Sequence, residues 1–95
     1  MISNIIIEQL GGARFKAMTG SYNFIDTGKG LRITLRRNLS GAKWLLINLN
    51  SLDTYDLKFI KLRKGEAITV AEYKDVYWDM LPKIYESVTG QYLTL

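Results

Sequence analysis

The chain has 95 residues, of which 47% are apolar and 12% aromatic, and its formal net charge is +4. This composition is typical of one small globular domain and lies far from the low hydrophobicity of disordered chains. Because the sequence contains no histidine and no cysteine, it excludes Ser-His-Asp and Cys-His catalysis, His or Cys metal sites and disulfides. We therefore expect a non-enzymatic protein without a metal or other cofactor.

The first segment, Asn4 to Leu10, is predicted to be a short helix. The Ser3 hydroxyl can cap its first turn, and Gly11-Gly12 can end it in a left-handed conformation. Three successive β-branched residues, Ile5 to Ile7, favour a strand as the alternative.

Residues Ala13 to Phe24 are predicted to be extended around a small turn at 19–21, because Phe15 and Ala17 alternate with basic side chains. The turn formers of segment 26–30 then predict a hairpin loop. Leu31 to Arg36 is the clearest strand, since apolar and polar residues alternate with the period of two that gives one buried and one basic face.

The strands that follow are predicted from the same alternation. A turn at 38–41 leads into Lys43 to Asn50, which is apolar on both faces, as expected of a central strand. Alternation resumes from Tyr55 to Ile60, and the phase of Leu62 indicates a bulge. A turn at 64–66 then precedes a last strand around Ala67 to Tyr73.

The C-terminal segment is predicted to form an amphipathic helix that Gly90 ends. Pro82 leaves two possibilities for its start: Asp79 caps the helix after an irregular approach, or the helix is kinked. Residues 91–95 are expected to dock on the body of the domain. The apolar residues at helical spacing are Val76, Met80, Leu81, Ile84 and Val88.

Together these segments predict a single α+β domain over residues 1–95. Its antiparallel sheet has four or five strands, with a short N-terminal helix and a C-terminal helix packed on one face. The longest apolar runs fall far below the roughly 20 residues that span a bilayer, and residues 1–4 lack the positive flank of a signal peptide. We therefore expect a cytoplasmic protein with no membrane partner.

Charge is distributed unevenly along the chain. Residues 14–64 hold eleven basic and three acidic side chains, whereas residues 66–95 hold two basic and five acidic ones. Cationic grooves with aromatic stacking platforms typically hold single-stranded nucleic acid, so the basic sheet surface is a candidate site for DNA or RNA. The alternative is a basic face that is only solvated. The candidate residues are Arg32, Arg36, Arg37, Lys58, Lys61, Arg63, Lys64 and Trp44, with Tyr22 and Tyr73 as further platforms.

A second hypothesis concerns four C-terminal aromatic residues, Tyr77, Trp78, Tyr85 and Tyr92. They cannot all share the apolar face of the predicted helix, so they either wrap the sheet edge or form an exposed apolar patch. Such a patch marks a protein interface. It predicts a protein-interaction module, either a homodimer or an inhibitor of a host protein.

Asp53 and Asp56 are the closest pair of carboxylates in the basic half of the chain. Two nearby carboxylates are what a hydrolase or a Mg²⁺ site requires. The favoured interpretation is structural, because an Asp at the entrance of a strand commonly accepts local backbone N–H groups in an Asx turn.

Three stretches of the chain resemble the motifs of a family of small bacteriophage and prophage proteins. Residues 11–24 read GGxRFxAMTGxxNF, residues 52–59 read LDxYDxxF, and residues 89–93 read TGxYL. The resemblance covers most of the chain and implies a host-cell cytoplasm with DNA, RNA or a host protein as partner. The family carries no established activity, so it implies no catalytic or binding residue.

Overall fold

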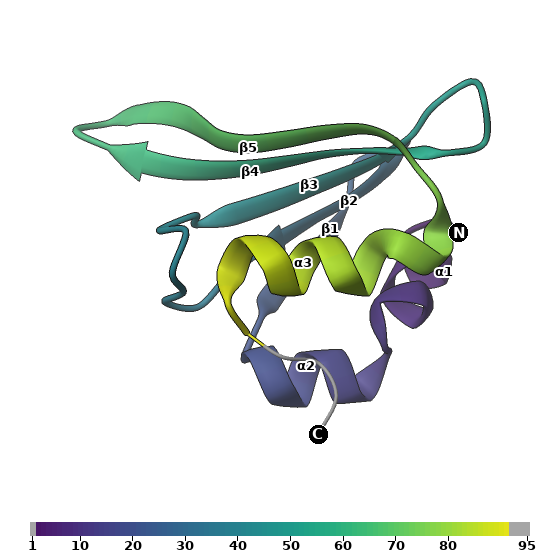
Figure 1. The fold of residues 1–95 in the computed structure, drawn as a ribbon, viewed down its shortest axis with the longest axis horizontal. Coiled ribbons are helices and arrows are strands. Elements are labelled where there is room, and N and C mark those ends of the chain that lie inside the picture. Colours follow the sequence, from purple (N-terminus) through teal and green to yellow (C-terminus); the bar gives the residue numbers. More distant parts are fainter. Residues whose placement is uncertain (1, 92–95) are drawn as a thin grey trace.

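The computed structural model describes residues 2–91 and contains five strands and three α-helices (Figure 1). The strands form one antiparallel sheet in the order β1-β2-β3-β4-β5, so each pairs with its neighbours in the chain. This confirms the predicted α+β class. The elements are α1 (Ile2–Leu10), α2 (Ala13–Thr19), β1 (Tyr22–Asp26), β2 (Gly30–Thr34), β3 (Trp44–Leu49), β4 (Tyr55–Arg63), β5 (Glu66–Val76), the 3-10 helix η1 (Trp78–Met80) and α3 (Leu81–Thr89).

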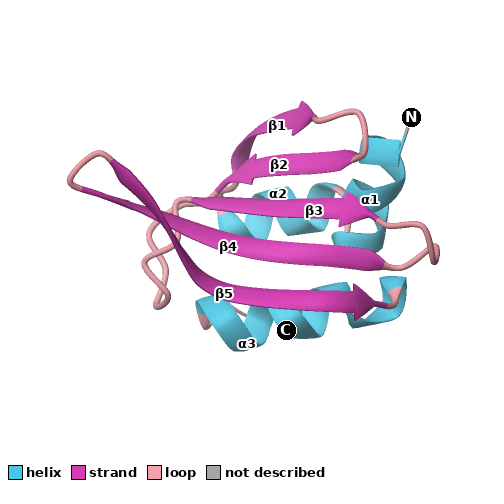
Figure 2. Cartoon of the chain, turned by 90° about the horizontal axis from the view of Figure 1, so that it is seen from above, coloured by secondary structure: helices cyan, strands magenta, loops and turns pink. Residues whose placement is uncertain are grey.

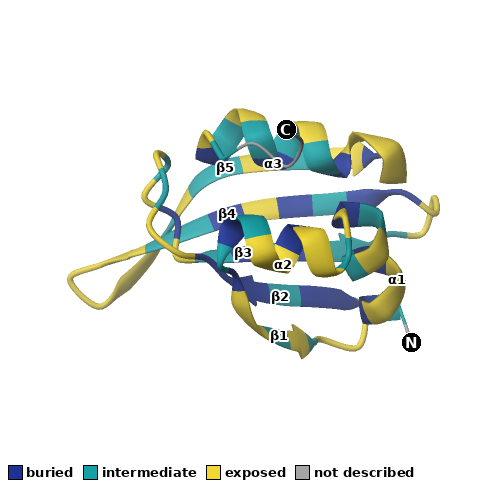
Figure 3. Cartoon of the chain, turned by 90° about the horizontal axis from the view of Figure 1, so that it is seen from below, coloured by how far each residue is buried: buried dark blue, intermediate teal, exposed yellow. Residues whose placement is uncertain are grey.

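All three α-helices lie on one face of the sheet, which we call the covered face, and the opposite face is the open face (Figures 1 and 2). Alternation along β3 shows the division: Leu45 and Ile47 are fully buried, whereas Trp44 and Leu46 lie on the open face and are half-buried. The core therefore fills the space between the covered face and the helices (Figure 3). Its fully buried apolar side chains are Ile6, Leu10, Phe15, Leu31, Ile33, Leu45, Ile47, Leu57, Phe59, Leu81 and Tyr85.

Helix α1 confirms the predicted helix and not the alternative strand. Ser3, Ile6 and Leu10 recur at helical spacing and are buried. Burying one isoleucine contributes about 1.5–3 kcal/mol, which outweighs the few tenths of a kcal/mol that a β-branched residue costs in a helix. The helix already includes Ser3, so the expected cap is wrong: the Ser3 hydroxyl instead donates to Asp26 Oδ2 at 2.8 Å.

The prediction of an extended segment over residues 13–19 is wrong, because these residues form α2. Phe15 and Thr19, one helical turn apart, are buried, whereas Ala17 is exposed. Five residues of apparent alternation are too few to distinguish a strand from a short helix. Gly20 ends α2 in a left-handed conformation with φ 67°, and its N–H donates to the Lys16 carbonyl at 3.0 Å.

Helices α2 and α3 end in the same way. The hydroxyls of Thr19 and Thr89 each donate at 2.7 Å to the carbonyl four residues earlier, which belongs to Phe15 and Tyr85 respectively. Gly90 follows Thr89 at φ 73°, so the predicted end of the last helix is confirmed. The two aromatic rings meet edge to face with centroids 5.0 Å apart, which joins both helices at the centre of the core.

The start of α3 differs from both alternatives that Pro82 left open. Asp79 lies within η1, and no side chain caps the helix, which begins at Leu81 with Pro82 in its first turn. A proline is compatible with this position because the first N–H groups of a helix have no intrahelical partner. Consequently Val76 belongs to β5 and Met80 is 41% exposed, and the buried face of α3 consists of Leu81, Tyr85 and Thr89.

The predicted hairpin at 26–30 is present. The bulge predicted from the phase of Leu62 is not in β4, because Ile60 to Arg63 pair without interruption; the extra residue lies in the partner strand β5. Phe59 pairs with Ala71 but Ile60 pairs with Thr69, so Val70 is an extra residue in β5. Strand β3 is central in the sheet, as its two apolar faces indicated. The segment 92–95, expected to dock on the domain, lies outside the described residues. Within residues 2–91, no helix is long and apolar enough to cross a membrane.

Gly30 is the position where strand packing tolerates no side chain. A Cβ there would lie 1.9 Å from the Ile47 carbonyl oxygen, a backbone atom that cannot move away alone. We predict that Gly30→Ala lowers the free energy of unfolding by about 2–3 kcal/mol. In urea denaturation, the control Gly28→Ala should cost only about 1 kcal/mol, because its φ of 88° is strained but nothing lies within 4 Å. Equal losses in the two variants would contradict this role of Gly30.

Candidate nucleic-acid interface

The two ends of the sheet carry opposite charge. In an antiparallel meander, the segment 36–43 after β2 and the segment 61–66 at the β4–β5 turn meet at one end, which we call the basic end (Figure 2). The turns at 26–30 and 50–56 and the end of β5 form the opposite, acidic end. The basic end holds Arg36, Arg37, Lys43, Lys61, Arg63 and Lys64 against Glu66, and the acidic end holds Asp26, Asp53, Asp56 and Asp75 against Lys29 and Lys74.

A row of side chains crosses the open face next to the basic end. The strand register aligns Tyr22, Thr34, Trp44, Ile60 and Thr69, one from each strand in order, and we call them the aromatic row. Paired residues project to the same side of a sheet. The row therefore presents two aromatic side chains on the open face, separated by the small Thr34.

A cation accompanies each aromatic ring of the row. The guanidinium carbon of Arg36 lies 4.7 Å from the centroid of the Tyr22 ring, and Lys43 Nζ lies 5.1 Å from that of Trp44. Both separations are within the range of cation–π attraction. Arg36 is fixed further because its Nε donates to the Gly20 carbonyl at 3.0 Å. Each ring is thus paired with a positive charge at the basic end.

The next row toward the middle of the sheet contains Arg32. Its cross-strand neighbours are Ile25 and Leu46, and both are apolar. Arg32 Nε is buried and has no hydrogen-bond partner among residues 2–91. Beside it lies a pocket of about 310 Å³, which is lined by Thr27, Arg32, Trp44, Leu46, Ile60 and Ala67.

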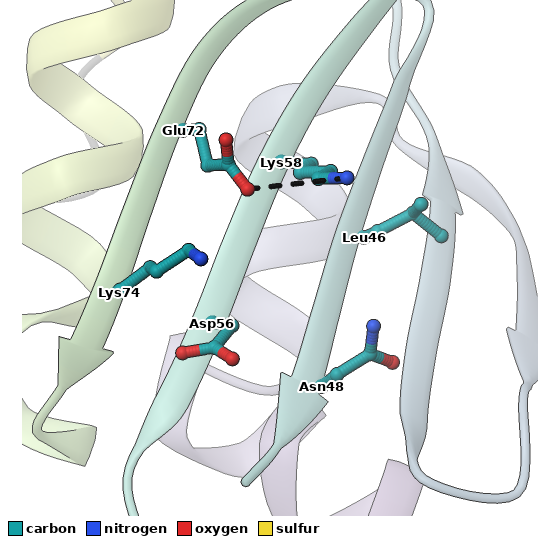
Figure 4. Close-up of a pocket in the computed structure, with 6 residues that line it drawn as sticks. All are labelled: Leu46, Asn48, Asp56, Lys58, Glu72 and Lys74. Carbon is teal, nitrogen blue, oxygen red and sulfur yellow. Dashed lines mark ion pairs between the residues drawn. The ribbon is translucent and has the colours of Figure 1, made fainter.

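The part of the open face nearer the acidic end is mixed in charge, as Figure 4 shows. Lys58 Nζ lies 3.9 Å from Glu72 Oε2, and both side chains are about half exposed. Such a surface pair contributes about 1 kcal/mol or less. Lys74 and Asp56 lie beside this pair in the same hollow.

The structure therefore divides the predicted basic surface. Arg32, Lys58 and Trp44 lie on the open face, whereas the other five residues lie at the basic end. Alternation along β4 places Lys61 and Arg63 on the side opposite to Ile60, and Lys64 occupies the turn at φ 52°. The exposed Arg36 and Arg37 follow β2.

The structure changes the interpretation of one aromatic residue, Tyr73, and adds one cation, Lys43. Tyr73 pairs with Leu57 and packs against the core, so it is not a platform on the open face. Lys43 was absent from the candidate list although it contacts Trp44. Its position directly before Trp44 was the available sequence signal, but the alternation rule places neighbouring side chains on opposite faces. Lys43 lies in the bend before β3 begins at Trp44, so the alternation of the strand does not determine the side on which its long side chain lies.

The four C-terminal aromatic residues do not form one patch. Tyr85 is fully buried against Phe15, and burial raises the pKa of its hydroxyl. Tyr77 and Trp78 are 67% and 60% exposed. Tyr92 lies outside the described residues.

Asn50 organises the acidic end. Its Nδ2 donates to Asp56 Oδ1 at 3.0 Å and to Asp75 Oδ1 at 3.1 Å, and its Oδ1 accepts the Leu52 N–H at 2.9 Å. The expected Asx turn is therefore made by Asn50 rather than by Asp53. Within residues 2–91, no three potential metal-ligating side chains form a group.

Asp56 is held ionised by this arrangement. The hydrogen bond from Asn50, followed by that from the Asp75 N–H, lowers the pKa of the Asp56 carboxyl below its ordinary value of 3.8. A lowered folded-state pKa stabilises the fold above the unfolded-state pKa, and this stabilisation is lost as the pH falls through the folded-state value.

We predict that Asp56→Asn reduces the free energy of unfolding at neutral pH and flattens its decline as the pH falls below 3.8, the ordinary value. Asparagine keeps the shape and an acceptor oxygen, so the variant isolates the charge. The measurement is chemical denaturation across the acid range. Asp53→Asn serves as control, because the exposed Asp53 makes no side-chain hydrogen bond within residues 2–91, and it should leave the acid profile as in the parent chain. If the pH dependence of the unfolding free energy is the same in Asp56→Asn as in the parent chain, the Asp56 carboxylate does not contribute to stability.

No family model matches the chain, and no curated protein or solved structure matches it. The functional interpretation therefore rests on the residues described above.

Proposed function

We propose that this protein is a non-enzymatic binding protein that holds single-stranded DNA or RNA across the basic end of its open sheet face. The observation that carries the proposal is the pairing of each ring of the aromatic row with a cation, Tyr22 with Arg36 and Trp44 with Lys43. Rings supply surfaces for bases and cations supply partners for phosphates.

The spacing of the two rings suits a strand that crosses the sheet. Tyr22 and Trp44 stand on β1 and β3, so two inter-strand spacings, or about 10 Å, separate them. Stacking of a base on an aromatic side chain contributes about 1–3 kcal/mol per base. Two platforms therefore provide useful affinity without a deep cleft.

The charge arrangement favours one placement of the ligand. Arg36 and Lys43 contact the two rings of the aromatic row. Arg37, Lys61, Arg63 and Lys64 add positive charge at the same end of the sheet, Lys61 and Arg63 from the side of the covered face. The four aspartates of the acidic end repel phosphates. The resemblance to bacteriophage and prophage proteins agrees with this reading, since nucleic acids are common partners in that setting.

A second candidate function is protein interaction, as a homodimer or as an inhibitor of a host protein. It is favoured by the exposure of Tyr77 and Trp78, which follow β5 directly and lie next to the partly exposed Met80. Exposed aromatic residues and methionine are enriched at protein interfaces.

For nucleic-acid binding, we predict that labelled oligonucleotides of about ten nucleotides bind with a log–log salt slope of about −2 to −3, the value for three to four phosphate contacts. Trp44→Ala should weaken binding about 10-fold, because one stacking platform is lost. The control Trp78→Ala removes an exposed tryptophan outside the aromatic row and should leave affinity unchanged. The absence of salt-sensitive binding at about 50 mM salt would end the nucleic-acid proposal.

For the second candidate, we predict that a homodimer built on Tyr77 and Trp78 dissociates when both are replaced by serine. Sedimentation equilibrium measures the change, and Ile5→Ser, which removes a half-exposed apolar residue of α1, is the control. If the parent chain is monomeric at every accessible concentration, the homodimer is ruled out. The second candidate is then reduced to binding of a host protein.

A further inference from the structure

The pocket beside Arg32 gives the proposed interface a means of selecting one base. We propose that it takes a guanine, stacked against Trp44 with its acceptor edge toward the Arg32 guanidinium. This inference rests on the proposed function, since it assumes that a single strand lies on the open face. It goes further by naming the preferred base and the residue that recognises it.

The pocket is open because the bulge in β5 changes which residues face it. Glu72 lies on the open face opposite Lys58, so an unbroken strand would also place Val70 and Ile68 on that face. The extra residue Val70 reverses the alternation, and Ala67 and Thr69 take their places. Two small side chains instead of two large ones leave space beside Trp44.

The walls of the pocket suit a flat apolar ring. Trp44, Leu46, Ile60 and Ala67 supply most of its lining, and its volume of about 310 Å³ is sufficient for one nucleobase. A hydrated phosphate would lose water in these surroundings without gaining enough polar partners in return. The apolar lining therefore favours a base over a phosphate at this point.

Arg32 supplies the polar contact. Its side chain makes no hydrogen bond and no ion pair with another residue of 2–91, and its Nε is buried. Because Nε is shielded from solvent, the terminal guanidinium nitrogens, which make no hydrogen bond within residues 2–91, are the donors that a ligand in the pocket can reach. Arg32 can therefore donate hydrogen bonds to a ligand that carries acceptor atoms.

The donor geometry of arginine selects among the bases. The guanidinium carries donors and no acceptor, in a planar fork. Guanine presents the two acceptors O6 and N7 on one edge, which is the commonest specific match for arginine. On the same edge, adenine combines one acceptor with a donor and thymine offers one acceptor. Cytosine has two neighbouring acceptors, N3 and O2, on the edge that a single strand leaves unpaired, but its single ring gives Trp44 a smaller stacking surface. Guanine is therefore the base that combines two acceptors for Arg32 with a large stacking surface.

The pocket is continuous with the aromatic row, because Trp44 and Ile60 belong to both. A strand whose phosphates follow the basic end can place one base on Tyr22 and the guanine between Trp44 and Arg32. Lys58 lies in the same row as Arg32, beyond Leu46, but it faces Glu72 and does not line this pocket.

The test compares thymidine oligonucleotides of about ten nucleotides that carry one central dG, dA or dC, by fluorescence anisotropy at several salt concentrations. We expect the dG oligonucleotide to bind about 10-fold more tightly than the all-thymidine one, with dA and dC between them. Arg32→Lys should keep the salt slope and lose the dG preference, because lysine retains the charge but not the fork. Arg36→Lys, a matched change at the basic end, should retain the preference.

A second pair of variants tests the pocket without altering charge. Ala67→Leu fills the space beside Trp44 and should abolish the dG preference, whereas Ala67→Ser keeps the space and should preserve it. Because residue 67 is exposed on β5, neither change disturbs the core. Circular dichroism checks that each variant is folded, and the Ala67 pair decides the question if Arg32→Lys does not fold.

The outcomes separate this inference from the proposed function. If no oligonucleotide binds, the proposed function itself fails. If all bind with equal affinity and the expected salt slope, or if Arg32→Lys retains the dG preference, the guanine pocket is overturned and the nucleic-acid function stands. A dimer in sedimentation that Trp44→Ala dissociates would show that a second copy covers the pocket, and would overturn the inference too.

Discussion

The open face exists because three short helices can cover only one side of a five-stranded sheet. On the covered side, the rings of Phe15 and Tyr85 meet at 5.0 Å and join α2 to α3 over the central strands. Most of the apolar burial that stabilises so small a domain lies in this single layer. The other face keeps Trp44, Leu46 and Ile60 only half-buried, so it can gain stability by binding a partner.

The topology of the sheet determines where the charge lies. Because neighbouring strands run in opposite directions, side chains that are distant in sequence, such as Arg36 and Lys64, gather at the same end. The basic middle of the chain therefore becomes a basic end and not a uniformly basic face. The same alternation brings the carboxylates of Asp56 and Asp75 together under Asn50 at the other end.

The sequence predicted the elements in which one periodicity is long and unambiguous. Strands β2, β3 and β4 show clear alternation, and Gly90 ends α3 as expected. The prediction failed in α2, where helix and strand patterns coincide over a few residues, and at Tyr85, whose burial depends on α3 starting at Leu81. The sequence predicted which residues make up the candidate site but not where they lie on the sheet. The side of the sheet on which Lys61 and Arg63 lie, for example, depends on the strand register.

The nucleic-acid interpretation is tested most directly by mapping amide chemical-shift changes in the labelled protein as an oligonucleotide with one central dG is added. The interface predicts that the largest changes occur at Tyr22, Thr34, Trp44 and Ile60 and at the amide of Arg32, with α1 and α3 nearly unaffected. Changes that centre on Tyr77 and Trp78 or on the acidic end, or no changes at all, would contradict it.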